Sequence, residues 1–283
     1  MATLGLVAGT GNLPAELAVS ARRSGWRVVA VGLHGLADPA LAAHVDALEW
    51  AHVADFDRLF EVLRAAGAQD VVLAGKVPKT FLWEHPDLVR PDVRALREFA
   101  ALRDRKDDSL LGAVVRVIET EGLRVRSQLE LAPDLCAPAR VLGQVRPSAE
   151  QEQDIAFGWP VAKALGALDV GQSVVVQGKA VLALEAVEGT DRAIERGASL
   201  AERGRGVVVV KVAKPKQDLR FDVPTIGLAT LRTLAKGGGG ALAVEAGLTL
   251  VLERAELVAE ADAAGIALLG VDGEHLPGGG GAA

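Results

Sequence analysis

The sequence predicts an α/β protein of two domains. Short apolar runs rich in β-branched residues alternate with amphipathic stretches of helical period, as in repeated units of strand, helix and strand. The chain has 283 residues, 50% of them hydrophobic, which is enough for two hydrophobic cores. The expected boundaries are residues 1–130 for the first domain, 131–138 for a linker, 139–276 for the second domain and 277–283 for a flexible tail.

The N-terminal stretch predicts a Rossmann-like parallel sheet. Residues 4–8 have the pattern of a buried strand, residues 9–14 form a glycine-rich turn, and a helix and a second strand follow. The N–H groups of such a turn can hold an anion. However, Pro14 replaces the third glycine of a dinucleotide fingerprint, and no acidic residue follows the second strand. The pattern disfavours a nicotinamide-dependent oxidoreductase and leaves open a bound nucleotide, a bound phosphate or merely a tight turn.

More polar residues follow the predicted strand at residues 70–74. Lys76 and Lys79 come directly after this strand. Ligands of open α/β sheets bind at the carboxyl ends of the strands. We therefore expect Lys76 and Lys79 to share one edge of the sheet with Gly9 and Gly11.

Two polar motifs precede predicted helices, and each has two interpretations. Asp108 and Ser109 stand before one helix, and Glu188, Thr190 and Asp191 stand before another. Asp, Ser and Thr are common helix caps. The same carboxylates and hydroxyls can bind a metal ion, a ribose or a sugar phosphate. The sequence leaves both interpretations open.

The densest polar motif is the loop at residues 211–227, which directly follows a valine-rich strand. It contains four cations and two carboxylates, and its prolines restrict the backbone. Cleavage of a pyrophosphate requires positive charge near the phosphate oxygens, which Lys214 and Arg220 can supply. Asp222 can bind a metal ion or orient a water molecule. Further along, Glu245 lies in an apolar run and needs a partner, because burial of an unpaired carboxylate is costly.

Composition and charge exclude several classes of function. The formal net charge of -6, without a basic stripe, argues against nucleic acid as the main partner. No stretch has the length of a membrane span, and the start lacks a signal-peptide pattern, so we expect a cytoplasmic protein. Cys136 has no histidine nearby, which favours a small buried or linker residue over a nucleophile.

Five motifs in this order carry a resemblance to a known family. Together they resemble the LpxI-type UDP-2,3-diacylglucosamine pyrophosphatases of lipid A biosynthesis in Gram-negative bacteria, over nearly the whole chain. The motifs are Gly5-Leu-Val-Ala-Gly9-x-Gly11-x-Leu13-Pro14, Asp107-Asp108-Ser-Leu-Leu, Ala164-Leu-Gly166-x-Leu-Asp169-Val-Gly171-Gln, Ala186-Val-Glu188-Gly-Thr-Asp191 and Lys214-Pro-x-Gln-Asp-x-Arg-Phe-Asp222-Val-Pro-Thr-Ile-Gly227.

The resemblance implies a reaction, a metal ion and a set of site residues. The reaction is hydrolysis of UDP-2,3-diacylglucosamine to UMP and 2,3-diacylglucosamine 1-phosphate (lipid X), with Mg²⁺ or Mn²⁺, in the cleft between the two domains. Asp222 is expected as the essential aspartate and metal ligand, and Lys214 and Arg220 as catalytic cations. The residues expected to bind the substrate are Gly9, Gly11, Leu13, Lys76, Asp108, Gly178, Glu188, Thr190, Asp191, Gln217 and Thr225.

The partner implied by the resemblance is an acylated UDP-sugar. A homodimer and a transient contact with the inner-membrane surface are open alternatives. The chain departs from the family pattern at residues 75–79 and at residues 237–240, where we expect a flexible turn of four glycines. The alternative function is a nucleotide-sugar-binding or regulatory protein without catalysis. Release of phosphate-containing products from the substrate in the presence of Mg²⁺ would distinguish the two.

Overall fold

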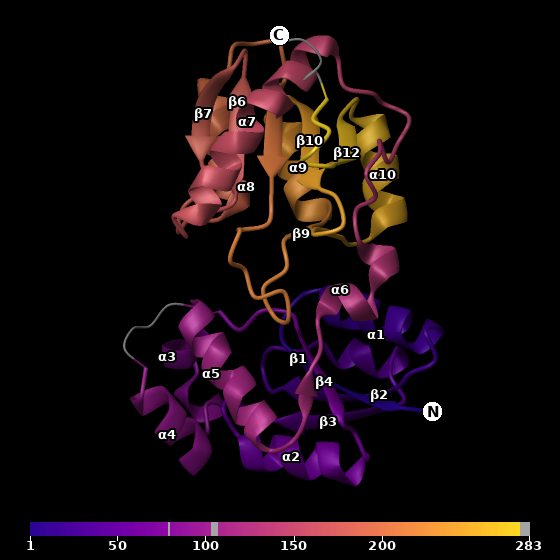
Figure 1. Cartoon of the computed structure of the whole chain (residues 1–283), viewed down its shortest axis with the longest axis vertical. Coiled ribbons are helices and arrows are strands. Elements are labelled where there is room, and N and C mark those ends of the chain that lie inside the picture. Colours follow the sequence, from indigo (N-terminus) through magenta and orange to yellow (C-terminus); the bar gives the residue numbers. More distant parts are fainter. Residues whose placement is uncertain (79, 103–106, 278–283) are drawn as a thin grey trace. The chain divides into compact units, whose positions relative to one another are not determined.

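The structure, a computed structural model, describes residues 1–78, 80–102 and 107–277, with the backbone only at residues 107–109. Lys79 lies outside the described residues. The chain forms two compact units, and most of their helices and strands are labelled in Figure 1. Unit 1 comprises Met1–Asp134 and Asp218–Asp222, and unit 2 comprises Leu135–Gln217 and Val223–Ala283. The short segment 218–222, which the sequence analysis placed in the second domain, thus packs with the first unit.

Unit 1 confirms the expected Rossmann-like parallel sheet. Its five strands are all parallel, in the order β3-β2-β1-β4-β5. The chain order reverses between β1 and β4, which is the point where open α/β sheets bind ligands. The strands are β1 (Thr3–Ala8), β2 (Arg27–Leu33), β3 (Ala47–Ala51), β4 (Asp70–Ala74) and β5 (Arg124–Val125).

The helices of unit 1 pack on the sheet through apolar side chains. Gly5 of β1 allows this close approach, since a Cβ there would lie 2.3 Å from the Leu63 side chain. Asp55 and Asp92 cap two of the helices. The helices are α1 (Leu13–Arg23), α2 (Phe56–Ala65), α3 (Phe81–Glu84), α4 (Val93–Ala100), α5 (Asp107–Thr120) and α6 (Gln128–Leu131), with 3₁₀ turns η1 (Pro39–Ala43), η2 (Pro86–Leu88) and η3 (Pro133–Leu135).

Unit 2 is the expected second α/β domain, and its sheet is mixed. The strand order is β12-β10-β8-β6-β7, in which β8, β10 and β12 are parallel and β6 and β7 are joined as an antiparallel hairpin. The strands are β6 (Ser173–Gln177), β7 (Ala180–Leu184), β8 (Val207–Lys211), β10 (Gly239–Glu245) and β12 (Ala267–Val271), and a small separate sheet contains β9 (Thr225–Ile226) and β11 (Leu250–Val251).

Two apolar cores lie on the two faces of this sheet. Alternate valines of β8 enter opposite cores, because successive side chains of a strand point to opposite faces. A helix with a Ser148–Gln151 capping box covers one face, and three helices cover the other. The helices are α7 (Ala149–Ala167), α8 (Thr190–Leu200), α9 (Leu228–Lys236) and α10 (Arg254–Ala263).

The glycine run at residues 237–240 differs from expectation. Only its first half forms the turn after α9, since β10 already begins at Gly239. Gly240 lies beside the Gln151 amide, where a Cβ would come within 2.4 Å. Close packing therefore explains part of this run, which the sequence analysis had assigned wholly to a flexible turn.

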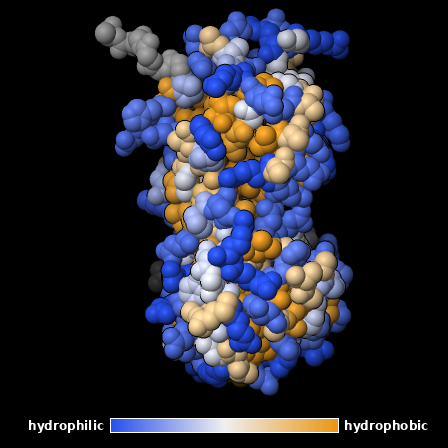
Figure 2. Space-filling model, turned by 90° about the vertical axis from the view of Figure 1, so that its right-hand side faces the viewer, coloured by the Kyte–Doolittle hydropathy of each residue, from blue (hydrophilic) through white to orange (hydrophobic). Residues whose placement is uncertain are grey.

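The surface combines hydrophilic residues with apolar patches on the face shown in Figure 2. This agrees with a chain in which half of the residues are hydrophobic. In the described part of the chain, no helix is both long and apolar enough to span a membrane.

Candidate active site

The carboxyl edge of the sheet in unit 1 brings together Gly9, Gly11 and Lys76, as expected. Gly9 N donates to Ala74 O at 2.9 Å, and Thr10 and Lys76 exchange backbone hydrogen bonds of 2.9 and 3.1 Å. A Cβ on Gly9 would lie 2.5 Å from Lys76 O, and Gly11 has a φ of +94°. Gly9 is thus needed for the approach of the two loops, whereas a Cβ on Gly11 would meet no atom within 4 Å and glycine is favoured there by the positive φ alone.

The start of α1 lies at the same edge. Leu13 is its first residue, so the helix begins within the stretch 9–14 that the sequence predicts as a turn, and the buried Pro14 lies in the first helical turn. The α1 N-terminus and the exposed Lys76 therefore both contribute positive potential there. The side chain of Asp108, another predicted substrate ligand, lies outside the described residues.

The segment 218–222 presents Arg220 and Asp222 as part of unit 1. Arg220 Nε and Nη2 bind the Asp218 carboxylate at 3.0 and 2.7 Å. The third guanidinium nitrogen, Nη1, lies 2.7 Å from Glu119 Oε1 on helix α5. The hydrogen bond from Arg220 holds the pKa of Asp218 below its ordinary value. Asp222 is half-buried, and within the described residues no hydrogen bond or ion pair engages its carboxylate.

A chain of polar contacts occupies the carboxyl edge of β8 in unit 2. Lys211 is 6% exposed, and its Nζ donates to Thr190 Oγ1 at 2.9 Å. Thr190 Oγ1 donates to Glu185 Oε1, also at 2.9 Å, and lies 3.4 Å from Ser173 Oγ. The predicted residue Thr190 is therefore the centre of a partly buried network that includes a cation and an anion.

The neighbouring acidic residues bind partners inside unit 2. Glu188 Oε1 lies 2.6 Å from Arg196 Nη2, and this hydrogen bond lowers the pKa of Glu188. Asp191 Oδ1 accepts a hydrogen bond of 2.8 Å from Thr230 in the first turn of α9. The N-termini of α8 and α9 are thereby held next to each other, and both carry positive partial charge.

Two side chains hold the first residues of the charged loop. Glu245, which from its sequence context needs a partner, pairs with Lys163 of α7, whose Nζ lies 2.6 Å from both carboxylate oxygens. The same pair binds the backbone of Ala213, at 2.7 Å to its N–H and 3.1 Å to its carbonyl oxygen. Lys214 Nζ then contacts Asp169 at 2.8 Å, and Lys214 N donates to Gln217 Oε1 at 2.9 Å.

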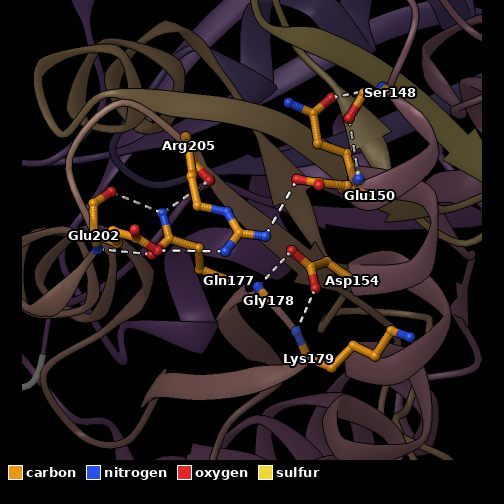
Figure 3. Close-up of polar contacts among 10 residues, drawn as sticks. Ser148, Glu150, Asp154, Gln177, Gly178, Lys179, Glu202 and Arg205 are labelled. Carbon is orange, nitrogen blue, oxygen red and sulfur yellow. Dashed lines mark hydrogen bonds and ion pairs between the residues drawn. The ribbon is translucent and has the colours of Figure 1, made fainter.

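Thr225 and Gly178 have local structural roles. Thr225 Oγ1 donates to Val223 O at 3.0 Å. Gly178 and Lys179 form the turn of the β6–β7 hairpin with φ values of 61° and 56°, and their N–H groups donate to the buried Asp154 at 2.9 and 2.6 Å (Figure 3). A two-residue turn with positive φ at both positions favours glycine.

The sheet also separates Gly178 from the other predicted residues of unit 2. Gly178 follows the carboxyl end of β6, which is antiparallel to β8, so it lies beside the amino end of β8. Lys211 ends β8 at the opposite edge of the sheet. Because β8 has five residues, Lys211 lies about 15 Å from Gly178. The hairpin turn accounts for Gly178, and its predicted contact with the same ligand as Thr190 has no support from this arrangement.

Several polar residues of these clusters were not identified from sequence. Ser173, Lys163 and Glu119 lie 17, 50 and 101 positions along the chain from groups that they contact, whereas Glu185 lies only five positions from Thr190. Glu185 was recognisable in principle, because it ends an apolar run in the same way as Glu245. The others have no distinctive local pattern.

The donor set has implications for a divalent cation. In the described part of the chain, no group of three or more His, Cys, Asp or Glu side chains is arranged to hold a metal ion. Mg²⁺ often keeps several water ligands and is bound by one or two carboxylates together with substrate phosphates. The carboxylate of Asp222 fits this type of Mg²⁺ site, in which the protein supplies only one or two ligands and the substrate and water supply the others.

The fold and these clusters define a class of protein. A parallel sheet with a glycine turn at its switch point, and a second sheet with helix N-termini and buried cations at its edge, are typical of α/β proteins that bind phosphorylated ligands. Residues 3–135 match the model of the LpxI N-terminal domain, and residues 138–269 match that of the LpxI C-terminal domain. The chain belongs to the LpxI family.

A relative in Caulobacter vibrioides, named UDP-2,3-diacylglucosamine pyrophosphatase LpxI, is 38% identical over 288 residues, covering 98% of this chain and 100% of the relative. Solved structures give weaker matches. L-threonine dehydrogenase from Phytophthora infestans has 16% identity and a TM-score of 0.29, with 44% of this chain and 34% of that chain covered. UDP-glucose-4-epimerase from Stenotrophomonas maltophila has 13% identity and a TM-score of 0.28, with 44% and 35% covered. Such low similarity carries no argument about function.

Proposed function

We propose that this protein hydrolyses the pyrophosphate bond of UDP-2,3-diacylglucosamine to UMP and 2,3-diacylglucosamine 1-phosphate, as a step of lipid A biosynthesis. The observation that carries the proposal is the 38% identity to the Caulobacter vibrioides pyrophosphatase along its entire length. The polar clusters of both units support it, because they supply cations, helix N-termini and a carboxylate.

Asp222 is the catalytic carboxylate in this proposal. Hydrolysis adds water across a P–O–P bridge: the water oxygen bonds to one phosphorus, the bridging bond breaks, and the second phosphate leaves with the bridging oxygen. A carboxylate near the reacting phosphorus can orient the water and accept its proton. Asp222 suits this role, since its carboxylate is half-buried and engages no side chain among the described residues.

The cations of unit 2 neutralise phosphate charge. Lys214 comes at the start of the loop and is positioned by Asp169, while Lys211 is buried beside Thr190. Charged donors fixed before the reaction stabilise developing negative charge without reorganisation. Gln217 and Lys76, which were also predicted as ligands, bind the nucleotide and sugar phosphate in this proposal.

A divalent cation, Mg²⁺ or Mn²⁺, completes the proposed site. Asp222 would hold it together with substrate phosphate oxygens, because Mg²⁺ is often bound by one or two carboxylates and the phosphates of the substrate. The cation would supply charge neutralisation at the phosphates. We further propose that the protein acts in the cytoplasm and meets its acylated substrate at the inner-membrane surface.

The test is a comparison of the wild-type protein with Asp222→Asn. Purified protein is incubated with UDP-2,3-diacylglucosamine and Mg²⁺, and the products are identified by mass spectrometry. We expect UMP and 2,3-diacylglucosamine 1-phosphate from the wild type, and a kcat at least about 100-fold lower for Asp222→Asn. Binding of substrate without any product would favour the alternative of a nucleotide-sugar-binding protein. A variant that kept more than about a tenth of the rate would exclude Asp222 as the catalytic carboxylate.

A further inference from the structure

The segment 218–222 is a compact turn with its own hydrogen bonds. Phe221 N and Asp222 N both donate to Asp218 O, at 3.2 and 3.0 Å. The Asp218 carboxylate accepts from Arg220 N at 3.1 Å and from the Arg220 guanidinium. These bonds fix the backbone that carries the Asp222 side chain.

Three contacts of different kinds attach this turn to unit 1. Ser127 Oγ donates to Leu219 O at 2.9 Å. Arg220 Nη1 pairs with Glu119 Oε1 at 2.7 Å. The Phe221 ring packs against the apolar core of unit 1. The turn therefore belongs to unit 1 in its packing, although residues on both sides of it belong to unit 2.

The guanidinium of Arg220 is already committed to protein carboxylates. Nε and Nη2 bind Asp218 in a bidentate pair, and Nη1 binds Glu119. An arginine that held a substrate phosphate would have to give up part of this geometry. The contacts indicate that Arg220 links the turn to α5 instead of meeting the phosphates directly.

From this arrangement we infer that Glu119, Arg220 and Phe221 are positioning residues that dock the 218–222 turn on unit 1 and thereby hold Asp222 in place for catalysis. The functional half of this inference rests on the proposed role of Asp222. The docking half does not, because it concerns the free protein. Since no described side chain orients the Asp222 carboxylate, its position depends on the backbone of the docked turn.

The experiment compares two double variants of the full chain. Glu119→Gln with Phe221→Leu weakens the ion pair and the apolar contact of the turn. The matched control is Glu98→Gln with Phe99→Leu. Glu98→Gln weakens the ion pair of Glu98 with Arg116, which lies on helix α5 as Glu119 does. Phe99→Leu reduces the packing of a partly buried ring against the same core of unit 1 that Phe221 contacts. Among the described residues, no hydrogen bond or ion pair joins Glu98 or Phe99 to the turn.

Hydrogen exchange and steady-state kinetics are measured on the test double variant and on the control double variant. For the test variant we expect the amides of residues 221 and 222 to exchange about tenfold faster or more than in the wild type, because an exposed ion pair and part of an apolar contact are lost. We also expect kcat to fall about tenfold while KM stays within about twofold, since misplacement of a catalytic group acts on the transition state. The control should leave both quantities within about twofold of the wild type.

Each outcome decides one part of the inference. Unchanged exchange at residues 221 and 222 in the test variant would overturn the docking. Faster exchange with an unchanged kcat would overturn the positioning role. An equal fall of kcat in the control would also overturn it, because general loosening of unit 1 would then suffice. If the wild-type protein released no product, the proposed function would fail, and the exchange measurement would still decide the docking.

Discussion

The buried ion pair of Lys163 and Glu245 allows a quantitative prediction about unit 2. The two partners differ in burial: the side chain of Glu245 is 12% exposed and that of Lys163 is 30% exposed. Removing one partner leaves the other without its counter-charge, and the penalty grows with the burial of the charge that remains. Loss of the lysine should therefore cost more than loss of the carboxylate charge.

Two substitutions test this asymmetry. Lys163→Met keeps the apolar stem of the side chain and leaves the buried carboxylate with the Ala213 N–H as its remaining donor among the described residues. We therefore expect a loss of about 3 kcal/mol, at the lower end for a broken buried pair. Glu245→Gln keeps an oxygen for the Ala213 N–H, and the more exposed ammonium of Lys163 can gain water. We expect a loss of about 1 to 2 kcal/mol for that variant.

The measurement is native-state hydrogen exchange at the amides of β8 and β10. These amides report the free energy of opening unit 2 by itself, which unfolding of a chain with two units does not give directly. Glu150→Gln is the matched control, because Glu150 lies on the same helix α7 but is 76% exposed in its pair with Arg205 (Figure 3). It should cost less than about 0.5 kcal/mol. A smaller loss for Lys163→Met than for Glu245→Gln would refute the burial argument.

Three further predictions concern the metal ion, the pH dependence and the hairpin turn. EDTA should abolish hydrolysis and added Mg²⁺ or Mn²⁺ should restore it, whereas activity that survives exhaustive chelation would exclude an essential cation. Burial and the nearby His52 and Arg90 lower the pKa of His34 below 6.5, so stability of unit 1 should be complete above about pH 6.5 and decrease as the pH falls towards the lowered pKa. His34→Phe should flatten that decrease, measured by exchange of β2 amides at about pH 7.5 and about pH 5.5; an unchanged slope would assign it to another group. Gly178→Ala should destabilise unit 2 by about 1 kcal/mol because of its positive φ while leaving kcat/KM unchanged, and a loss of activity without a loss of stability would instead support substrate binding by Gly178.

Local sequence patterns were sufficient for the buried strands at residues 4–8 and 70–74 and for one edge of the first sheet. The apolar runs before Gly9 and Lys76 are short and continuous, as required of strands buried on both faces of a parallel sheet. Carboxyl ends of neighbouring parallel strands lie at one edge, so the proximity of Gly9, Gly11 and Lys76 follows from the βαβ pattern. The need of Glu245 for a partner follows from the cost of burying a carboxylate.

The identity of that partner was decided only by the tertiary structure. Lys163 is 82 residues from Glu245 in sequence, and nothing in either local pattern links them. Likewise, the antiparallel direction of β6 places Gly178 at the edge opposite Lys211. Periodicity determines which face of a strand is buried, but strand order and direction depend on the packing of whole elements.

The placement of Asp222 shows the same division. From sequence, the segment 218–222 is part of a loop after β8 and would belong to the second domain. In the structure it packs with unit 1, because its Phe221 ring contacts the core of that unit and the Ser127 hydroxyl and the Glu119 carboxylate bind its other residues. These contacts join residues about 100 positions apart, and a contact between distant residues forms only when the elements that carry them have folded and met.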